Sequence, residues 1–150
     1  MDPKLTVLIV EDNENDALLL DRACSRVGRT NPVHIVRDGA EAIEYLKGQG
    51  PYANRDTCPF PDVLFIDLKM PRVNGFELLD WMRQDFRCSM VPSVVFTSSA
   101  EDVDVERAYR LGANAYFVKP ASLHDLEEML RTVFDFWSFC VKPSPHGYCA

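Results

Sequence analysis

The fold of this 150-residue chain is decided by residues 63–75, VLFIDLKMPRVNG. Its first four residues form a continuous apolar run, which is typical of a strand buried on both faces of a parallel sheet. The run ends in a carboxylate, Asp67, and the proline and glycine that follow indicate a turn. The stretch therefore predicts a strand, a turn and the start of a helix, with an acidic side chain at the carboxyl end of the strand.

Three other apolar runs also end in polar residues. They are residues 7–10, followed by Glu11 and Asp12; residues 94–96, followed by Thr97; and residues 115–118, followed by Lys119. In a doubly wound sheet, ligand sites lie outside the carboxyl ends of the strands, at a topological switch point. We therefore expect these polar side chains to converge on one crevice.

Strand-like runs alternate with amphipathic, helix-like segments, which predicts an α/β domain with a doubly wound parallel sheet of five βα units. The expected strands are residues 4–10, 33–36, 62–67, 93–97 and 115–118, and the expected helices are residues 13–27, 40–47, 75–86, 101–111 and about 122–137. Residues 1–138 are predicted to form one domain, and residues 139–150 a C-terminal tail.

Residues 48–61 interrupt this alternation. They contain three prolines and two glycines and predict a long loop. Loops of this length are uncommon in compact domains, so the segment is either an insertion that forms an interaction surface or solvated decoration.

Composition excludes several classes of function. The net charge of -7 argues against nucleic-acid binding by the surface of the domain. No apolar run approaches the roughly 20 residues that cross a bilayer, and the N-terminus lacks the blocks of a signal peptide. We therefore expect a cytoplasmic protein that contacts neither nucleic acid nor membrane.

The predicted crevice would suit phosphoryl transfer. Three carboxylates in one place repel one another unless a cation compensates them, and Mg²⁺ is bound through few carboxylates and several waters. Lys119 and Thr97 would offer a positive charge and a hydroxyl donor to phosphoryl oxygens. Asp67 lies in the middle of the set and is a plausible nucleophile, since aspartyl phosphates are known covalent intermediates.

With these features together, residues 4 to about 138 resemble a response-regulator receiver domain of two-component signalling. The resemblance rests on VEDN at 10–13, DLKMPRVNG at 67–75, FTSS at 96–99 and GANAYFVKP at 112–120. All four segments occur in order and at the intervals of the family. The resemblance implies the flavodoxin-like fold with strand order 2-1-3-4-5.

The resemblance also implies a role for each site residue. Asp67 would be the phosphoacceptor, and Thr97 and Lys119 would bind the phosphoryl group. Mg²⁺ would be held by Glu11, Asp12, Asp67 and the backbone carbonyl of Lys69. Thr97 and Tyr116 would form the conformational switch, Lys119–Pro120 would be a cis peptide, and Gly75 would start the third helix. The acidic pair is Glu-Asp where Asp-Asp is commoner, and Lys69 and Ser99 occupy positions that tune the lifetime of the phosphoryl group.

Partners follow from the same resemblance. A sensor histidine kinase or phosphotransfer protein would dock on the first helix, through Asn15, Leu18, Asp21, Arg22 and Ser25. A downstream protein or a homodimer would form through the face made by the fourth helix, the fifth strand and the fifth helix. The protein would be a stand-alone receiver, and the loop at 48–61 suggests similarity to receivers that serve phytochrome-type kinases. Its only chemistry would be self-catalysed phosphotransfer and autodephosphorylation.

Two other functions stay open. A metal-dependent phosphohydrolase would use Asp67 as nucleophile, but such enzymes usually need an acidic residue two positions later, where this chain has Lys69. A pseudo-receiver would be a scaffold that never takes phosphate. The three histidines are not paired into a predicted metal site, and the aromatic residues near the end of the last helix either cover the core or form a partner surface.

Overall fold

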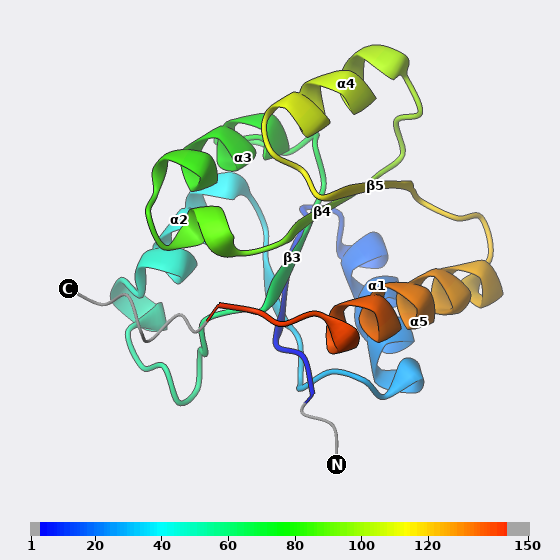
Figure 1. Ribbon diagram of the computed structural model, residues 1–150, viewed down its shortest axis with the longest axis horizontal. Coiled ribbons are helices and arrows are strands. Elements are labelled where there is room, and N and C mark those ends of the chain that lie inside the picture. Colours follow the sequence, from blue (N-terminus) through cyan, green and yellow to red (C-terminus); the bar gives the residue numbers. More distant parts are fainter. Residues whose placement is uncertain (1–3, 144–150) are drawn as a thin grey trace.

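The computed structural model describes residues 4–143 and shows five strands and five α-helices that alternate along the chain (Figure 1). The elements are β1 (Val7–Val10), α1 (Glu14–Val27), β2 (His34–Val36), α2 (Gly39–Lys47), η1 (Gly50–Tyr52), β3 (Val63–Ile66), α3 (Gly75–Gln84), η2 (Cys88–Met90), β4 (Ser93–Thr97), α4 (Asp102–Arg110), β5 (Ala115–Val118) and α5 (Leu123–Phe139). All strand pairs are parallel, and the order in the sheet is β2-β1-β3-β4-β5. The predicted doubly wound fold and strand order are confirmed.

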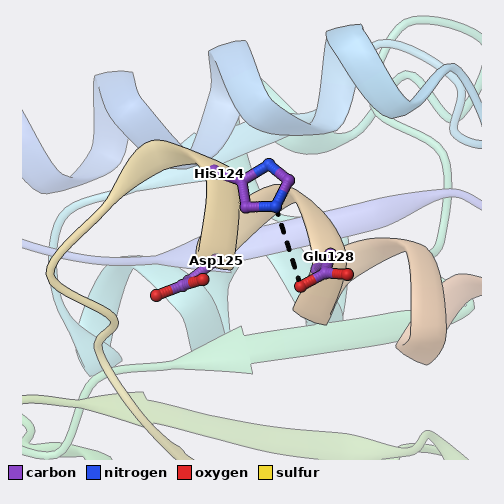
Figure 2. Close-up of side chains that lie close together, drawn as sticks. All are labelled: His124, Asp125 and Glu128. Atoms are coloured by element: carbon purple, nitrogen blue, oxygen red, sulfur yellow. Dashed lines mark ion pairs between the residues drawn. The ribbon is translucent and has the colours of Figure 1, made fainter.

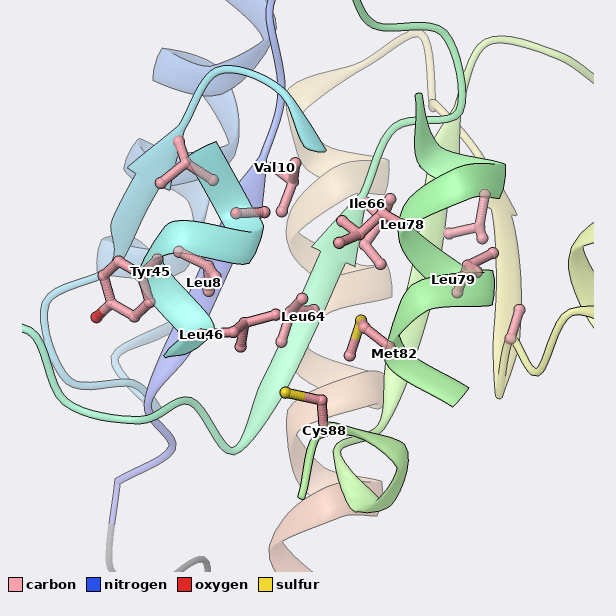
Figure 3. Close-up of a cluster of buried hydrophobic side chains, with 14 of the residues drawn as sticks. Leu8, Val10, Tyr45, Leu46, Leu64, Ile66, Leu78, Leu79, Met82 and Cys88 are labelled. Atoms are coloured by element: carbon pink, nitrogen blue, oxygen red, sulfur yellow. The ribbon is translucent and has the colours of Figure 1, made fainter. Parts of the chain in front are cut away.

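Helices cover both faces of the sheet, so the strands are buried on two sides. The helices α1 and α5 pack on one face, and α2, α3 and α4 lie on the other (Figure 1). Alternate residues of β1 divide between the two cores: Leu8 and Val10 face the α2–α3 side (Figure 3), whereas Val7 and Ile9 face α1 and α5. This two-sided burial explains why the strands are continuous apolar runs.

The bounds of the elements follow the sequence patterns closely. The structure has β4 and β5 at the predicted residues, and Asn13 caps α1 by accepting a hydrogen bond from the Asp16 amide. β1 starts later than expected because Leu5 makes only an isolated bridge, to Thr30. The expectation of a cis Lys119–Pro120 peptide is wrong, since every peptide bond within residues 4–143 is trans.

The long loop is tied to the body of the domain by one arginine. Arg55 donates hydrogen bonds to the carbonyls of Tyr45 and Leu46, at 2.9 and 2.8 Å, and to the Cys58 carbonyl at 3.2 Å. The carbonyls of Tyr45 and Leu46 are in the last turn of α2. Carbonyls in the last turn of a helix have no hydrogen-bond partner within the helix. The loop at 48–61 therefore completes the C-terminus of α2, although the sequence predicted only a solvated or interacting segment.

The end of α5 carries aromatic side chains that are not all buried. Phe134 is in the core and Trp137 is half-buried, whereas Phe136 and Phe139 are 59% and 89% exposed. The predicted tail begins in the last residue of this helix, and its residues 144–150 lie outside the described part of the chain. None of the helices within residues 4–143 combines the length and apolar character that crossing a membrane requires.

Candidate phosphoacceptor site

Three carboxylates meet at the carboxyl ends of β1 and β3. Glu11, Asp12 and Asp67 each place an oxygen within 4.8 Å of the others. Glu11 and Asp67 are buried, at 2% and 8% exposure, whereas Asp12 is exposed. The sheet itself sets these positions, since the Asp67 amide donates to the Val10 carbonyl at 3.0 Å. The predicted convergence of the acidic residues is therefore present in the structure.

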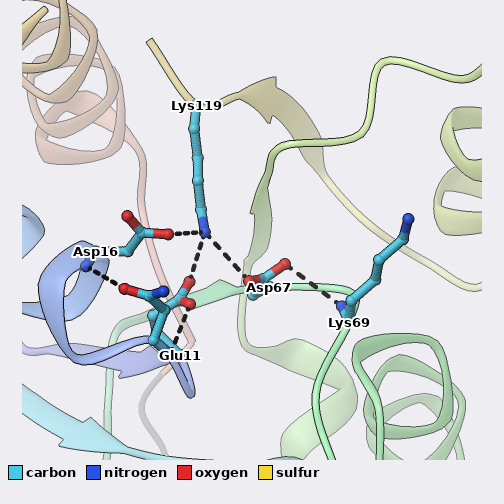
Figure 4. Close-up of polar contacts among 6 residues, drawn as sticks. Glu11, Asp16, Asp67, Lys69 and Lys119 are labelled. Carbon is cyan, nitrogen blue, oxygen red and sulfur yellow. Dashed lines mark hydrogen bonds and ion pairs between the residues drawn. The ribbon is translucent and has the colours of Figure 1, made fainter. Parts of the chain in front are cut away.

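The Lys119 side chain reaches into this group from the end of β5 (Figure 4). Its Nζ lies 3.2 Å from an Asp67 oxygen, 3.0 Å from a Glu11 oxygen and 2.7 Å from an Asp16 oxygen. Asp16, in the first turn of α1, was not predicted as a site residue. Its sequence signal was only an acidic residue in a first helical turn, where helix dipoles favour negative charge in any protein.

Burial and neighbouring charges shift the pKa values of Glu11 and Lys119. Burial raises the pKa of the Glu11 carboxyl to about 7, and the charge of Asp67 adds to the rise. Burial acts to lower the pKa of Lys119, but the hydrogen bond to Asp16 and the charges of Asp67 and Glu11 outweigh it and raise that pKa. Lys119 is therefore a cation at neutral pH, and the negative charge around Glu11 is only partly compensated.

A hollow opens on the other side of Asp67. It is lined by Asp67, Lys69, Thr97, Ser98, Ser99, Ala100 and Glu101. Thr97 is buried at the end of β4, and its carbonyl accepts a hydrogen bond of 2.7 Å from the Lys119 amide. The backbone thus fixes Thr97 and Lys119 to each other. The Lys119 ammonium lies beside Asp67, and Thr97 lines the same hollow as Asp67.

The loop between β3 and α3 is held against Asp67. A Cβ atom added at Gly75 would overlap the Asp67 carbonyl oxygen and would lie 2.7 Å from the Leu68 Cα. Only glycine permits this close approach of the start of α3 to the end of β3. The Lys69 amide donates a long hydrogen bond of 3.4 Å to Asp67 Oδ1, and the Lys69 side chain points away from Asp67 (Figure 4).

A bidentate ion pair fixes the same loop from outside. Arg72 donates to both carboxylate oxygens of Asp38, through Nε at 2.7 Å and Nη2 at 3.0 Å. Arg72 has a φ of 62°, which L-residues other than asparagine and aspartate rarely adopt. Asp38 is the N-cap of α2 and accepts a hydrogen bond of 2.8 Å from the Glu41 amide. One carboxylate therefore joins the β3–α3 loop to α2.

Tyr116 contacts the loop that follows β4. Its hydroxyl donates to the Ser99 carbonyl at 2.8 Å, and the Ser99 hydroxyl donates to Asp104 Oδ2 at 2.6 Å. The predicted switch residue is thus linked to the β4–α4 loop and the first turn of α4. The link through Ser99 was not predicted, because the sequence does not show which backbone atom a tyrosine hydroxyl will reach.

A second group with metal-binding side chains lies on α5. His124, Asp125 and Glu128 place donor atoms within 4.8 Å of one another, and His124 Nε2 lies 3.9 Å from Glu128 (Figure 2). All three side chains are exposed, and the ion pair joins neighbours one helical turn apart. Such pairs contribute only a few tenths of a kcal/mol to a helix surface. The grouping of His124 with two carboxylates was not predicted, and it lies on the exposed surface of α5.

The sequence matches the response regulator receiver domain family over residues 7–131. The chain belongs to this family. Receiver domains take phosphate from histidine kinases, and their acidic pocket binds Mg²⁺ or Mn²⁺.

Individual relatives match over most of their own length. The chain is 35% identical over 134 residues to the probable methanogenesis regulatory protein FilR2 of Methanothrix harundinacea, covering 87% of this chain and 82% of that protein. It is 33% identical to the response regulator Rcp1 of Synechocystis sp., covering 90% of each. The structure of the phosphorylated cyanobacterial phytochrome response regulator RcpA superposes with a TM-score of 0.85 at 33% identity, covering 95% of this chain and all (100%) of that one.

The residues at the acidic pocket fit a divalent cation. Two of the three clustered carboxylates are buried, and the pKa of Glu11 is raised first by this burial and then by the charge of Asp67. Oxygen donors of this kind are what Mg²⁺ and Mn²⁺ prefer. A solved structure of Rcp1, with a TM-score of 0.80 and 30% identity over 93% of this chain and 99% of that one, is an Mn²⁺-bound form.

Proposed function

We propose that this chain is a phosphoacceptor response regulator, which takes a phosphoryl group from a histidine kinase onto Asp67 in the cytoplasm. The observation that carries the proposal is the position of the Asp67 carboxylate. It lies within 4.8 Å of oxygens of the acidic pair Glu11 and Asp12 and 3.2 Å from the Lys119 ammonium, and it borders a hollow that Thr97 also lines. A nucleophile, its charge-compensating groups and space for a substrate are thus together.

In the proposed reaction, an Asp67 carboxylate oxygen attacks the phosphorus of a phosphohistidine. The new P–O bond forms as the P–N bond breaks, and the leaving imidazole keeps the electron pair and takes up a proton. Lys119, within 3.2 Å of Asp67, and Thr97 would each donate a hydrogen bond to a phosphoryl oxygen. The chain itself therefore supplies the nucleophile and two donors to the charge that develops in transfer.

The acidic pocket would hold the metal in this proposal. Glu11, Asp12, Asp67 and the backbone carbonyl of Lys69 are the proposed ligands. A bound Mg²⁺ would neutralise charge on the transferring phosphoryl oxygens. The exposed side of Asp12 leaves room for the waters that Mg²⁺ usually keeps.

The output of the site would be a change in protein–protein contacts. Attraction of Thr97 to a phosphoryl group would pull on the β4–α4 loop, to which Tyr116 is hydrogen-bonded through Ser99. The proposed output face, formed by α4, β5 and α5, carries exposed apolar residues: Val103, Tyr109, Val118 and Leu123. On α1, the proposed kinase-binding residues Asn15, Leu18, Arg22 and Ser25 are exposed and Asp21 is half-buried.

Phosphorylation with a small donor would test the proposal directly. The protein is incubated with acetyl phosphate and Mg²⁺, and intact mass is measured for the wild type, Asp67→Asn and the control Asp62→Asn. We expect one added phosphoryl group in the wild type and the control, and none in Asp67→Asn. A wild type that stays unmodified, and gives no spectral change with beryllium fluoride, would favour a scaffold. Steady turnover of a phosphate ester would favour a hydrolase.

A further inference from the structure

The Lys119 ammonium has no spare donor. It carries three N–H groups, and carboxylate oxygens of Asp16, Glu11 and Asp67 lie 2.7, 3.0 and 3.2 Å from Nζ. Its side chain is only 13% exposed, so water has little access to it. Any new partner of this ammonium must therefore replace one of the three carboxylates.

The three carboxylates differ in what else they can bind. Glu11 and Asp67 belong with Asp12 to the acidic cluster, whereas Asp16 is outside it. A divalent cation in that cluster would compete with Lys119 for the oxygens of Glu11 and Asp67 and would repel its ammonium. The Asp16 oxygen is the shortest contact of Lys119 and the one that such a cation would leave to it.

Asp16 is itself well placed for this contact. Its amide donates to the Asn13 side chain at 2.9 Å, which fixes the first turn of α1, and the next residue, Ala17, is buried. The Asp16 side chain is 35% exposed and lies at the rim of the site. The other end of the contact is fixed too, because the Lys119 amide is bonded to the Thr97 carbonyl. The lysine side chain is therefore the link between the rim and the cluster.

We propose that Asp16 is a positioning residue, which keeps the Lys119 ammonium beside the site through a partner that is not a metal ligand when a cation takes the oxygens of Glu11 and Asp67. This inference rests on the proposed function, because it concerns the same cation and the same phosphoryl group. Asp16 keeps Glu11 and Asp67 available to a cation, and it keeps Lys119 close enough to donate to a phosphoryl oxygen. Without Asp16, the ion-pair partners of Lys119 within residues 4–143 are Glu11 and Asp67, so the ammonium competes with the cation for the metal-binding carboxylates.

Binding of Mn²⁺ alone tests this role without any phosphoryl transfer. The affinity is measured by electron paramagnetic resonance for the full-length wild type, Asp16→Asn and the control Glu14→Gln. Glu14 is in the same turn of α1, and its partner is the exposed Arg37, 3.6 Å away. We expect about tenfold weaker binding in Asp16→Asn, as for residues that orient metal ligands. Glu14→Gln should change the affinity less than twofold, and equal losses in both variants would overturn the proposal.

A double-mutant cycle separates positioning from a simple field effect. In a Lys119→Met background, Asp16→Asn should have no further effect on Mn²⁺ affinity, because the competing ammonium is gone. If the negative charge of Asp16 merely attracted the cation, the loss would persist in that background, and the proposal would be wrong. Asp16→Glu keeps the charge and should recover most of the affinity.

The lysine itself gives a spectroscopic signature. The Lys119 Nζ protons should exchange slowly in the wild type by ¹⁵N nuclear magnetic resonance, and rapidly in Asp16→Asn once Mg²⁺ is added. Unchanged exchange in the Mg²⁺-loaded variant would contradict the proposal.

The outcomes of these experiments are distinct from those that test the proposed function. A wild type that binds no Mn²⁺ and takes no phosphoryl group overturns both, whereas a competent wild type with an equally competent Asp16→Asn overturns only this inference.

Discussion

Residues 68–74, between β3 and α3, and residues 98–101, between β4 and α4, both border Asp67 but are attached to the domain in different ways. The first loop is closed by backbone contacts and a full capping box at Asn74, and its Arg72 is anchored by two hydrogen bonds to a buried carboxylate. The second has three exposed residues of four, and side chains make its links to Tyr116 and Asp104.

This difference suggests different roles for the two loops: the first holds Asp67 in position, and the second changes its contacts when the site changes. A loop fixed by close backbone approach keeps the proposed acceptor and the proposed carbonyl ligand in place before any phosphoryl group arrives. A loop tied by a few hydroxyl hydrogen bonds exchanges those bonds at a cost of about 1 kcal/mol each. We therefore expect substitutions in the first loop to affect stability strongly, and substitutions in the second to affect motion more than stability.

The largest effect is expected at Gly75. In Gly75→Ala, the new methyl group would overlap the Asp67 carbonyl, so α3 must move away from the end of β3. Overpacking of this kind costs about 1–3 kcal/mol, and urea unfolding would measure it. The displaced carbonyl also belongs to Asp67, the proposed acceptor, so phosphorylation by acetyl phosphate should slow in the same variant.

Gly28→Ala is the matched control for this substitution. Gly28 ends α1 with a φ of 73° and has no atom within 4 Å of its added Cβ. Its replacement therefore carries only the conformational cost of a left-handed residue, about 1 kcal/mol, and should leave phosphorylation unchanged. Equal losses of stability and rate in the two variants would show that the contact at Gly75 is not what fixes the loop.

An intermediate effect is expected at Asp38, which joins the first loop to α2. Asp38→Ala removes an N-cap, at about 1 kcal/mol, and leaves Arg72 without its partner. Asp38→Asn keeps an acceptor for the Glu41 amide and should lose less stability. If both variants unfold at the urea concentration of the wild type, the connection between loop and helix is unimportant.

The same carboxylate gives the pH dependence of this loop. Burial acts to raise the pKa of Asp38, but the hydrogen bonds and charge of Arg72 outweigh it and hold the pKa below its ordinary value. The stabilisation is therefore complete above the unfolded pKa of about 3.9 and is lost as the pH falls through the lower folded value. Urea titrations between neutral and acidic pH should show this acid-side loss in the wild type and a smaller one in Asp38→Asn.

The smallest effect on stability is expected at Tyr116. Tyr116→Phe removes the hydrogen bond to the Ser99 carbonyl, at about 0.5 kcal/mol, because that carbonyl can bond to water instead. Amide hydrogen exchange in residues 98–101 should become faster, while residues 68–74 exchange as before. A loss of stability as large as that of Asp38→Ala would mean that the second loop is as firmly fixed as the first.

The fold could be predicted in detail because its signals are local. The strands expected at residues 93–97 and 115–118 match β4 and β5 to the residue, and the helix expected from residue 13 is α1, which Asn13 caps. The parallel topology then brings Glu11, Asp12 and Asp67 together, since each follows the end of a strand. Rules about strand ends are thus sufficient to locate the site.

Contacts made by long side chains could not be predicted in this way. Whether Asp16 faces Lys119 depends on the rotation of α1 about its axis. The contact between the two side chains therefore has no sequence pattern. The left-handed conformation of Arg72 also has no signal in the sequence, because glycine or asparagine is the usual indication of such a conformation. The trans peptide at Lys119 is a third case, in which family resemblance gave the wrong expectation.

The three contacts of Lys119 also have a consequence for folding. Its bonds to Asp16 and Asp67 join residues that are 103 and 52 positions apart in the chain. Contacts of such long range close only after most of the chain entropy has been lost, and they form late. A nascent chain that ends before β5 already contains Asp67 but lacks Lys119. The chain would therefore become able to accept a phosphoryl group only after its synthesis and folding are complete. Copies truncated before β5 would not take part in signalling.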